Sequence, residues 1–259
     1  MTASRFALAS FSVLATALCL SGIRASAAPA KSAPPTQAQI DLWQRQADER
    51  LHNDWAWLGR YAPDNAKLKA PAPGENRVVF MGDSITDFWI NKRPAFFADH
   101  PYLDRGISGQ TTPQMLVRFR ADVIDLHPRV VVILAGTNDI AGNTGPETPA
   151  MIEGYFASMV DLAQQNHIRV VLSSILPAAD YFWHHGVQPA PKIAAMNVWL
   201  RAYAAQRGCI YLDYYSAMQD GHGGMRKDLS EDGVHPNGAG YDVMAPLAIK
   251  AIEEALARK

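Results

Sequence analysis

Short apolar runs alternate with longer segments of helical periodicity over most of the chain. The apolar runs are typical of strands buried on both faces of a sheet, and they cover residues 78–81, 130–134, 170–172 and 210–212, with one more short strand near Leu103. The helical segments are residues 112–124, 149–166, 191–207 and 239–257. This alternation predicts an α/β fold of three layers, in which helices joined by right-handed crossovers flank a parallel sheet of about five strands.

The pattern is different before residue 77. From Ile40 to Leu58 the apolar residues recur every three or four positions, which predicts an additional N-terminal helix over residues 37–60 with one apolar face. Residues 63–74 contain several prolines and a glycine and are expected to form a linker. Residues 28–36 lack large apolar side chains, as a flexible lead-in does. The predicted organisation is therefore a helix with its linker at 37–74 and one α/β domain at 75–259.

The first 27 residues have the pattern of a secretory signal peptide. A positively charged start, residues 1–5, precedes an apolar run over residues 6–20 and the small residues Ala25, Ser26 and Ala27. The apolar run is shorter than the ~18 residues that a helix needs to span a bilayer. We therefore expect cleavage near Ala27, a secreted or periplasmic mature protein, and no membrane span after cleavage.

Composition narrows the classes of function. With 48% hydrophobic and 19% charged residues among 259, the chain can bury a large core. Its 24 Lys and Arg against 25 Asp and Glu give no general attraction for nucleic acid, so no nucleic-acid partner is expected. The two cysteines, Cys19 and Cys209, are too few for a disulfide scaffold or a cysteine-built zinc site. The sequence contains no common metal, nucleotide or dinucleotide motif, so neither a metal nor a cofactor is expected, and we interpret His184, His185 and His222 as polar surface residues.

Residues that could take part in a reaction follow three of the predicted strands. Ser84, in Gly-Asp-Ser, would begin a helix, where backbone N–H groups could support an attacking hydroxyl and the oxyanion that it creates; the alternative is an ordinary helix cap. Gly109 could bring its N–H close to a ligand, or serve a tight turn. Asn138 could donate its side-chain N–H to an oxyanion, or be a turn residue. Reacting groups gather at the carboxyl ends of parallel strands, so these three residues are candidates for one site.

A carboxylate and an imidazole stand three residues apart near the C-terminus. Asp232 could accept a hydrogen bond from Nδ1–H of His235 across one turn, which would leave Nε2 free to act as a base. The alternative is a turn that carries a solvated histidine. All of these candidates are placed after separate strands of one predicted sheet: a hydroxyl nucleophile, two oxyanion donors and an Asp/His pair. Their joint occurrence favours a hydrolytic site over a helix cap and a set of unrelated turns.

Four segments, in this order, resemble the motif blocks of the SGNH (GDSL-type) hydrolases. The segments are Gly82-Asp83-Ser84, Gly109, Gly136-Thr137-Asn138-Asp139 and Asp232-Gly233-Val234-His235. The similarity runs from the first strand to the C-terminus. The sequence around the first three blocks is most similar to the branch that contains platelet-activating factor acetylhydrolase subunits and bacterial acetylesterases.

The resemblance implies the flavodoxin-like fold of that family and ester hydrolysis through an acyl-enzyme, with no cofactor. In this scheme Ser84 attacks, His235 removes its proton and Asp232 orients the imidazole. The backbone N–H groups of Ser84 and Gly109 and the side chain of Asn138 hold the oxyanion. Asp83 is expected to hold the turn through hydrogen bonds to the backbone.

Two aromatic clusters flank the motif blocks and could contact the substrate. We assign this role to Trp89, Tyr181 and Trp183, whereas Phe88 is better suited to covering a helix against the core. Export favours a small-molecule or glycan ester as the partner, above all a short acyl group such as O-acetyl on a carbohydrate. A lysophospholipase or thioesterase of the same fold, an acyltransferase and a catalytically silent glycan-binding module are the alternatives. The N-terminal helix would fit its own domain or a partner subunit equally well, so the oligomeric state stays open.

Overall fold

The structure of the protein, a computed structural model, describes residues 36–258. Residues Gln44–Lys259 form one compact unit. The predicted signal peptide and all but the last residue of the predicted lead-in lie outside the described residues. The predicted cleavage site and domain boundaries therefore stay predictions.

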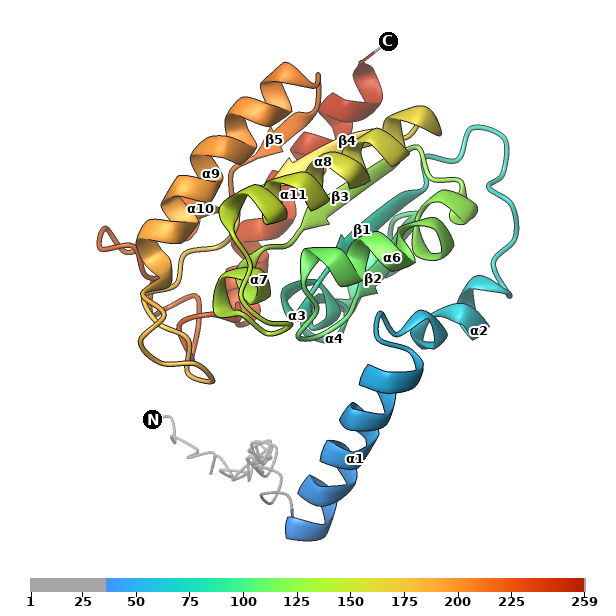
Figure 1. Ribbon diagram of the computed structural model, residues 1–259. Helices are drawn as coiled ribbons and strands as arrows, with labels where there is room; N and C mark the ends of the chain where they lie inside the picture. The colour runs from blue at the N-terminus through green and yellow to red at the C-terminus, as the bar shows by residue number, and fades with distance from the viewer. Residues whose placement is uncertain (1–35, 259) are drawn as a thin grey trace, which may run out of the picture. The chain divides into compact units, whose positions relative to one another are not determined.

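Five parallel strands form the sheet at the centre of this unit (Figure 1). They are β1 (Val78–Gly82), β2 (Tyr102–Gly106), β3 (Val130–Leu134), β4 (Arg169–Ser173) and β5 (Ile210–Leu212), in the spatial order β2-β1-β3-β4-β5. Gly82 at the end of β1 pairs with Gly106 of β2 and with Leu134 of β3, so these three strands end level with one another. The predicted α/β fold with five parallel strands is confirmed, and the loops after β1, β2 and β3 leave the same edge of the sheet.

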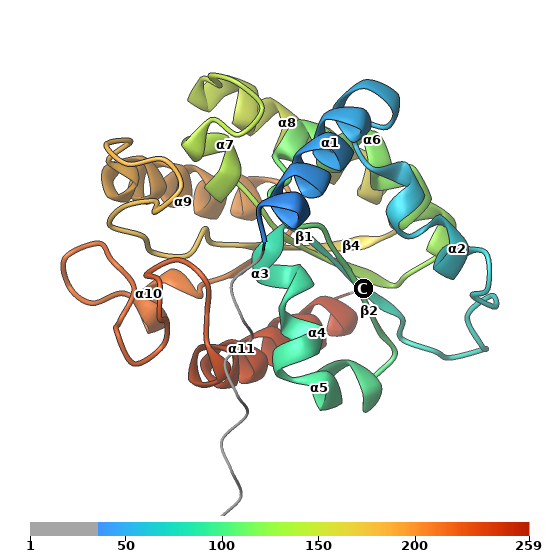
Figure 2. The same ribbon diagram turned by 90° about the horizontal axis from the view of Figure 1, so that it is seen from below.

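Helices cover both faces of the sheet (Figure 1, Figure 2). On one face lie α6 (Thr112–Asp122), α8 (Pro149–Gln165) and α9 (Pro189–Gln206), and on the other lie α4 (Trp89–Lys92), α5 (Pro94–Ala98) and α11 (Gly238–Ala257). The side chains of β1 alternate between two cores, because Val79 and Met81 join the first and Val78 and Phe80 join the second. Both faces of β1 are thus buried, which explains why the sequence shows an unbroken apolar run there.

The predicted long helices agree with α6, α8, α9 and α11 to within two residues at each end. Shorter helical pieces lie between the longer elements, namely α3 (Ser84–Asp87), α7 (Thr137–Ala141), α10 (Tyr215–Met218) and the 3₁₀ turn η2 (Ile124–Leu126). Two of them, α3 and α7, begin directly at the carboxyl edge of the sheet. They therefore bring residues of the first and third motif blocks to that edge.

The predicted N-terminal helix over residues 37–60 is confirmed up to Asn53 and is wrong beyond it. The helix α1 (Gln37–Asn53) ends before Asp54, and the 3₁₀ turn η1 (Leu58–Arg60) follows. The Asp54 carboxylate accepts hydrogen bonds from the backbone N–H groups of Leu58 (2.7 Å) and Gly59 (2.8 Å). These local side-chain bonds satisfy the backbone in place of the last helical turns. The predicted linker, residues 63–74, likewise contains most of a short helix, α2 (Ala62–Asn65).

Residues 54–61, which we call the Trp55 segment, are hydrogen-bonded to the loop after β2 and to the start of α6. The Trp55 carbonyl accepts from Nε2 of Gln114 (2.8 Å), and the Ala56 carbonyl accepts from Nε2 of Gln110 (2.7 Å). The buried Tyr61 hydroxyl donates to the carbonyl of Gly106. The Trp55 segment is thus built into the wall of the compact unit.

A buried arginine lies beneath the same loop. The Arg118 guanidinium is 0% exposed and donates to the Gly82 carbonyl (3.0 Å), to Oε1 of Gln110 (2.6 Å) and to the Asp122 carboxylate (3.0 Å). Gln110 also accepts, at its backbone carbonyl, a hydrogen bond from Nδ2 of Asn138 (3.0 Å). The end of β1, the loop after β2 and the residue after β3 are therefore fixed relative to one another.

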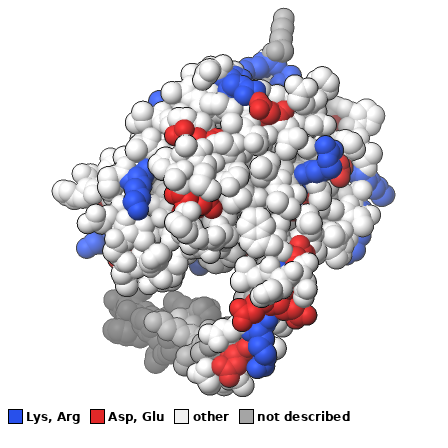
Figure 3. Space-filling view, in the orientation of Figure 1, with Lys and Arg blue, Asp and Glu red and all other residues white. Residues whose placement is uncertain are grey.

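The face of the compact unit shown in Figure 3 carries basic and acidic side chains interspersed among neutral ones. Within residues 36–258, the helices are too short or too polar to cross a membrane.

Arg118→Ala is expected to lower the free energy of unfolding by about 3–5 kcal/mol, because it leaves Asp122 as a buried carboxylate without its charged partner and with only the neutral donor Asn65 (2.7 Å). Arg120→Ala is the matched control. Arg120 lies on the same helix, its side chain is 65% exposed and it stands 3.9 Å from Asp125, so its loss should cost less than about 1 kcal/mol. Urea unfolding at pH 7 measures both values, and equal losses would contradict this role of Arg118.

Candidate active site

The motif blocks meet at the edge where β1, β2 and β3 end. Ser84 is the first residue of α3 after β1, Gly109 lies in the loop between β2 and α6, and Asn138 lies in α7 after β3. Asp232 and His235 come from the loop between α10 and α11. Residues that are far apart in the sequence therefore lie at one site.

Ser84 is held by the turn that joins β1 to α3. The preceding residue, Asp83, caps this helix, and its carboxylate accepts a hydrogen bond from the backbone N–H of Ile85 (2.9 Å). This is the turn-holding role that the sequence predicts for Asp83. The N–H of Ser84 stands at the first helical position and has no partner within the helix. The Ser84 hydroxyl oxygen lies 2.9 Å from Nε2 of His235.

The imidazole of His235 is fixed from its other side by Asp232. Nδ1 lies 2.8 Å from Oδ2 of Asp232, and Oδ1 accepts from the backbone N–H groups of Val234 (2.9 Å) and His235 (2.8 Å). Burial opposes the ionisation of Asp232, but the hydrogen bonds from the backbone and ring of His235 hold the pKa of this carboxyl below its usual value. An ionised Asp232 favours the tautomer with the proton on Nδ1, which leaves Nε2 as an acceptor facing Ser84.

Gly109 and Asn138 lie close to Ser84. Gly109 has a φ of 81°, in the left-handed region that favours glycine. Asn138 is buried, and its amide nitrogen donates one hydrogen bond to the carbonyl of Gln110 (3.0 Å). Because an amide carries two N–H groups, the second N–H of Asn138 is left for a ligand.

Asn143, which the sequence analysis did not single out, connects the loops around Asn138. Its Nδ2 donates to Oδ1 of Asn138 (2.9 Å) and to the carbonyl of Gly109 (3.1 Å), while its Oδ1 accepts from Nε1 of Trp183 (3.0 Å). These bonds fix which end of the Asn138 amide is the donor end. In the sequence, only a weak signal points to this residue, an asparagine in a glycine-rich stretch five positions after Asn138.

A cavity of about 270 Å³ lies over the Ser84 hydroxyl, and we call it the Ser84 cavity. Three aromatic rings surround the imidazole there, with ring centroids 5.3 Å (Phe88), 6.1 Å (Phe182) and 6.3 Å (Trp183) from that of His235. The full lining consists of Ser84, Phe88, Ser108, Gly109, Asn138, Asn143, Phe182, Trp183 and His235.

Two of the three predicted substrate contacts are wrong. Trp89 is 1% exposed and stacks on Phe96 in the core, with ring centroids 4.5 Å apart. Tyr181 is 0% exposed and stacks on Trp183. Phe88, which we assigned to the core, is 37% exposed and lines the cavity. Phe88 lies on the same side as Ser84 because it follows Ser84 by one helical turn, and its backbone N–H donates to the Ser84 carbonyl (2.9 Å). Trp89, one residue later, points in another direction and enters the core.

The last residue of the third motif block, Asp139, has a buried carboxyl group. Asp139 is 2% exposed, and its Oδ1 accepts hydrogen bonds from the backbone N–H (2.8 Å) and the hydroxyl of Thr112. Its Oδ2 has no hydrogen-bond partner among the described residues. Burial raises the pKa of Asp139 to about 7, with the Thr112 hydrogen bonds acting in the opposite direction. Burial likewise raises the pKa of Asp83 to about 6.

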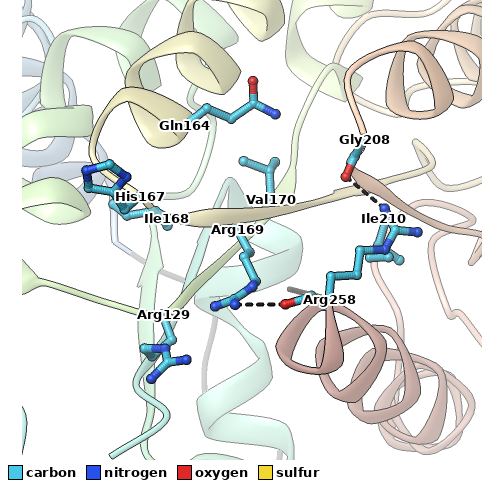
Figure 4. A pocket seen from close by; sticks show the side chains of 10 residues that line it. Arg129, Gln164, His167, Ile168, Arg169, Val170, Gly208, Ile210 and Arg258 are labelled. Carbon is cyan, nitrogen blue, oxygen red and sulfur yellow. Dashed lines mark hydrogen bonds between the residues drawn. The ribbon is translucent and has the colours of Figure 1, made fainter.

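A larger cavity, of about 580 Å³, lies at the opposite edge of the sheet (Figure 4). It is lined by the beginnings of β4 and β5 and by the side chains of Arg129, Arg169 and Arg258. Arg169 donates to the carbonyl of Arg258 (2.8 Å), and Arg258 donates to the carbonyl of Gly208 (2.7 Å). This cavity contains no residue of the four motif blocks, because those residues follow the carboxyl ends of the strands.

Within residues 36–258, no group of three or more His, Cys, Asp and Glu side chains is arranged to hold a metal ion. His184, His185 and His222 are exposed, and His185 pairs with Asp180 (2.6 Å).

Comparisons with known proteins agree with the motif blocks. Residues 80–243 match the GDSL-like lipase/acylhydrolase family. A solved structure of a candidate acylhydrolase from Bacteroides fragilis NCTC 9343 is 49% identical, with a TM-score of 0.78, over 79% of this chain and 100% of that chain. Esterase TesA of Pseudomonas aeruginosa is 27% identical over 168 residues, which cover 63% of this chain and 77% of TesA. The uncharacterized lipoprotein YqeF of Bacillus subtilis is 37% identical over 82 residues, and the match spans 26% of this chain and only 34% of YqeF.

Asp139→Asn is expected to flatten the dependence of stability on pH. The folded pKa of Asp139, about 7, lies above the usual value of about 3.9 in an unfolded chain, so between these values the folded state binds more protons. This contribution to the free energy of unfolding is complete below about pH 4 and is lost as the pH rises through 7. Asparagine keeps an oxygen for Thr112 and does not titrate.

Urea unfolding from pH 4 to 8 measures this effect, with Asp99→Asn, at an exposed carboxyl, as the control. The Asp139 variant should lose less stability over this range than the Asp99 variant. Identical pH profiles for the two variants would show that Asp139 does not titrate as described.

Proposed function

Because this chain belongs to the GDSL-like lipase/acylhydrolase family, it is an ester hydrolase, and we propose that it is a secreted serine esterase that removes short acyl groups through an acyl-enzyme on Ser84. The observation that carries the proposal is the chain of contacts from the Ser84 hydroxyl to Nε2 of His235 (2.9 Å) and from Nδ1 of His235 to Asp232 (2.8 Å). A glycan-binding module without chemistry would have no need of this arrangement.

In the first half of the reaction, His235 accepts the Ser84 proton at Nε2 as the hydroxyl oxygen attacks the ester carbonyl carbon. Asp232 keeps the other ring proton on Nδ1 and stabilises the imidazolium that forms. The tetrahedral intermediate then collapses. Its carbon–oxygen bond to the alcohol breaks, the alcohol takes the proton from His235, and the acyl group stays on Ser84.

The negative charge of the tetrahedral intermediate requires donors that are in place before it forms. The backbone N–H groups of Ser84 and Gly109 and the second N–H of Asn138 supply them. Asn143 positions the Asn138 amide by donating to its oxygen, and it contacts Gly109 through the same nitrogen. In the second half of the reaction a water gives a proton to His235 and attacks the acyl carbon. The bond from the acyl carbon to the Ser84 oxygen then breaks, His235 returns the proton to Ser84, and the carboxylic acid leaves.

The size of the Ser84 cavity supports a short acyl group. Its volume of about 270 Å³ is below the ~300–1,000 Å³ of cavities that enclose drug-sized ligands. The rings of Phe88, Phe182 and Trp183 leave room for a small group beside His235 and offer aromatic faces to what is attached to it. We therefore favour O-acetyl groups on a carbohydrate over the long acyl chains of a lysophospholipid.

Export is part of the proposal. Its support is the charged start, the apolar run and the small residues of positions 1–27, which are typical of a secretory signal peptide. One relative over part of its length, from Bacillus subtilis, is named a lipoprotein. An exported esterase encounters polysaccharides and exogenous esters as substrates.

Hydrolysis of p-nitrophenyl esters from acetate to palmitate tests the proposed activity. Activity should be highest on acetate and fall with chain length, and Ser84→Ala should lower kcat by roughly 10⁶-fold, as deletion of a nucleophilic serine does elsewhere. A peak at long chains would overturn the short-acyl specificity. A Ser84→Ala variant within tenfold of the wild type would exclude Ser84 as the nucleophile.

Variants of the two asparagines test the positioning of the oxyanion donors. Asn138→Ala should lower kcat by about 10²–10³-fold with KM little changed, because one donor to the transition state is lost. Asn143→Ala should lower kcat by roughly tenfold through a less well oriented Asn138, also without raising KM. The control is Asn166→Ala, at an exposed asparagine that caps α8. If Asn143→Ala and the control have the same kcat, Asn143 has no positioning role.

A further inference from the structure

A second hollow, of about 220 Å³, lies beside the Ser84 cavity. The two share Ser108 and Gly109 in their linings, so they lie on either side of the loop that carries a proposed oxyanion donor. The wall of this second hollow is formed by the Trp55 segment and the last turn of α1 together with Gln110 and Gln114. We call it the Trp55 hollow.

The Trp55 hollow combines aromatic faces with polar groups. Trp55 is 39% exposed, which is unusual for so large an apolar side chain. The Arg50 guanidinium stacks over the Trp57 ring, 4.3 Å from its centroid. The side chains of Arg50 and Asp54 both line the hollow beside the two indoles.

The wall is rigid, which a recognition surface requires. The carbonyls of Trp55 and Ala56 accept hydrogen bonds from Gln114 (2.8 Å) and Gln110 (2.7 Å), and Ala56 is 2% exposed. Trp57 has φ 52° and ψ 50°, a left-handed conformation that costs a non-glycine residue about 1 kcal/mol or more. Such strain persists only where the surroundings hold it, and it is concentrated at ligand sites.

We propose that the Trp55 hollow binds a sugar ring of the substrate, next along the oligosaccharide from the ring whose ester lies at Ser84. This inference rests on the proposed function and names its substrate class, an acylated oligosaccharide. A sugar ring has an apolar C–H face that packs on an indole and a hydroxyl edge that hydrogen-bonds to charged and polar groups. An acyl chain would need a uniformly apolar wall, which Arg50 and Asp54 do not provide.

The position of the hollow supports this order of rings. Ser108 and Gly109 separate the two cavities, so a ligand that extends from the ester carbonyl across this loop enters the Trp55 hollow. A substrate with a single ring fills only the Ser84 cavity. The contribution of Trp55 to kcat/KM should therefore depend on the number of sugar rings in the substrate.

The test compares an O-acetylated methyl xyloside, which has one ring, with an O-acetylated xylotriose, and acetate release measures kcat and KM. Trp55→Ala should lower the ratio of kcat/KM for the trisaccharide to that for the xyloside by about tenfold, mainly through KM for the trisaccharide. Trp55→Phe keeps an aromatic face and should restore most of the ratio. Leu58→Ala is the control, because Leu58 is 42% exposed, belongs to the Trp55 segment and lines neither cavity.

The outcomes separate this inference from the proposed function. If Trp55→Ala leaves the ratio unchanged while wild-type protein and variant both hydrolyse the xyloside, the subsite is wrong and the esterase stands. If Trp55→Ala instead changes the preference among p-nitrophenyl esters of different chain length, the hollow holds an acyl chain and the sugar subsite is wrong. If the wild type releases acetate from neither sugar nor from p-nitrophenyl acetate, the proposed function fails and this inference fails with it.

Discussion

Gln110 is the residue on which the geometry of the site depends. Its side-chain oxygen accepts from Arg118, its side-chain nitrogen donates to the Ala56 carbonyl, and its backbone carbonyl accepts from Asn138. Arg118 in turn holds the carbonyl of Gly82, two residues before Ser84. One buried amide therefore connects the loop after β2 to Arg118, to Asn138 and to the Trp55 segment, around the proposed nucleophile and oxyanion donors. A buried network of this kind is stabilising only when each polar group in it has a hydrogen-bond partner. Both the oxygen and the nitrogen of the Gln110 amide have one.

The sheet and the long helices could be predicted from the sequence. Strands that are buried on both faces consist of apolar runs, and helices that pack on the sheet show apolar residues every three or four positions. The end of α1 could not, because apolar residues keep the helical spacing up to Leu58. What ends the helix is the carboxylate of Asp54, which accepts from the N–H groups of Leu58 and Gly59. An aspartate at position 54 does not by itself show that its carboxylate will accept these bonds. The end of the helix is therefore visible only in the three-dimensional structure.

Most residues of the candidate site could be predicted, although the Asp232/His235 pair follows α10 and not a strand directly. Ser84, Asn138 and the Asp232/His235 pair each stand in a short segment whose chemistry can be recognised from its own sequence. The cavity wall is different. Phe88 and Trp89 are neighbours of similar composition, and the helical turn that begins at Ser84 decides which ring faces His235 and which enters the core. Asn143 and Phe182 reach the site from separate loops, and the glycine-rich stretch and the aromatic run in which they lie do not show that they face His235 or Asn138.

The hydrogen bonds of Gln110 and Gln114 connect the Trp55 segment to the α/β domain. Sequence composition places the α/β domain at residue 75, after the linker, yet the amides of Gln110 and Gln114 donate to carbonyls of the Trp55 segment. A chain that began at residue 75 would leave these two amides without their partners, at a cost of about 1–3 kcal/mol for each one that stays buried. The Trp55 segment therefore helps to hold the loop that contains Gly109, a proposed oxyanion donor, through the hydrogen bonds that its carbonyls accept.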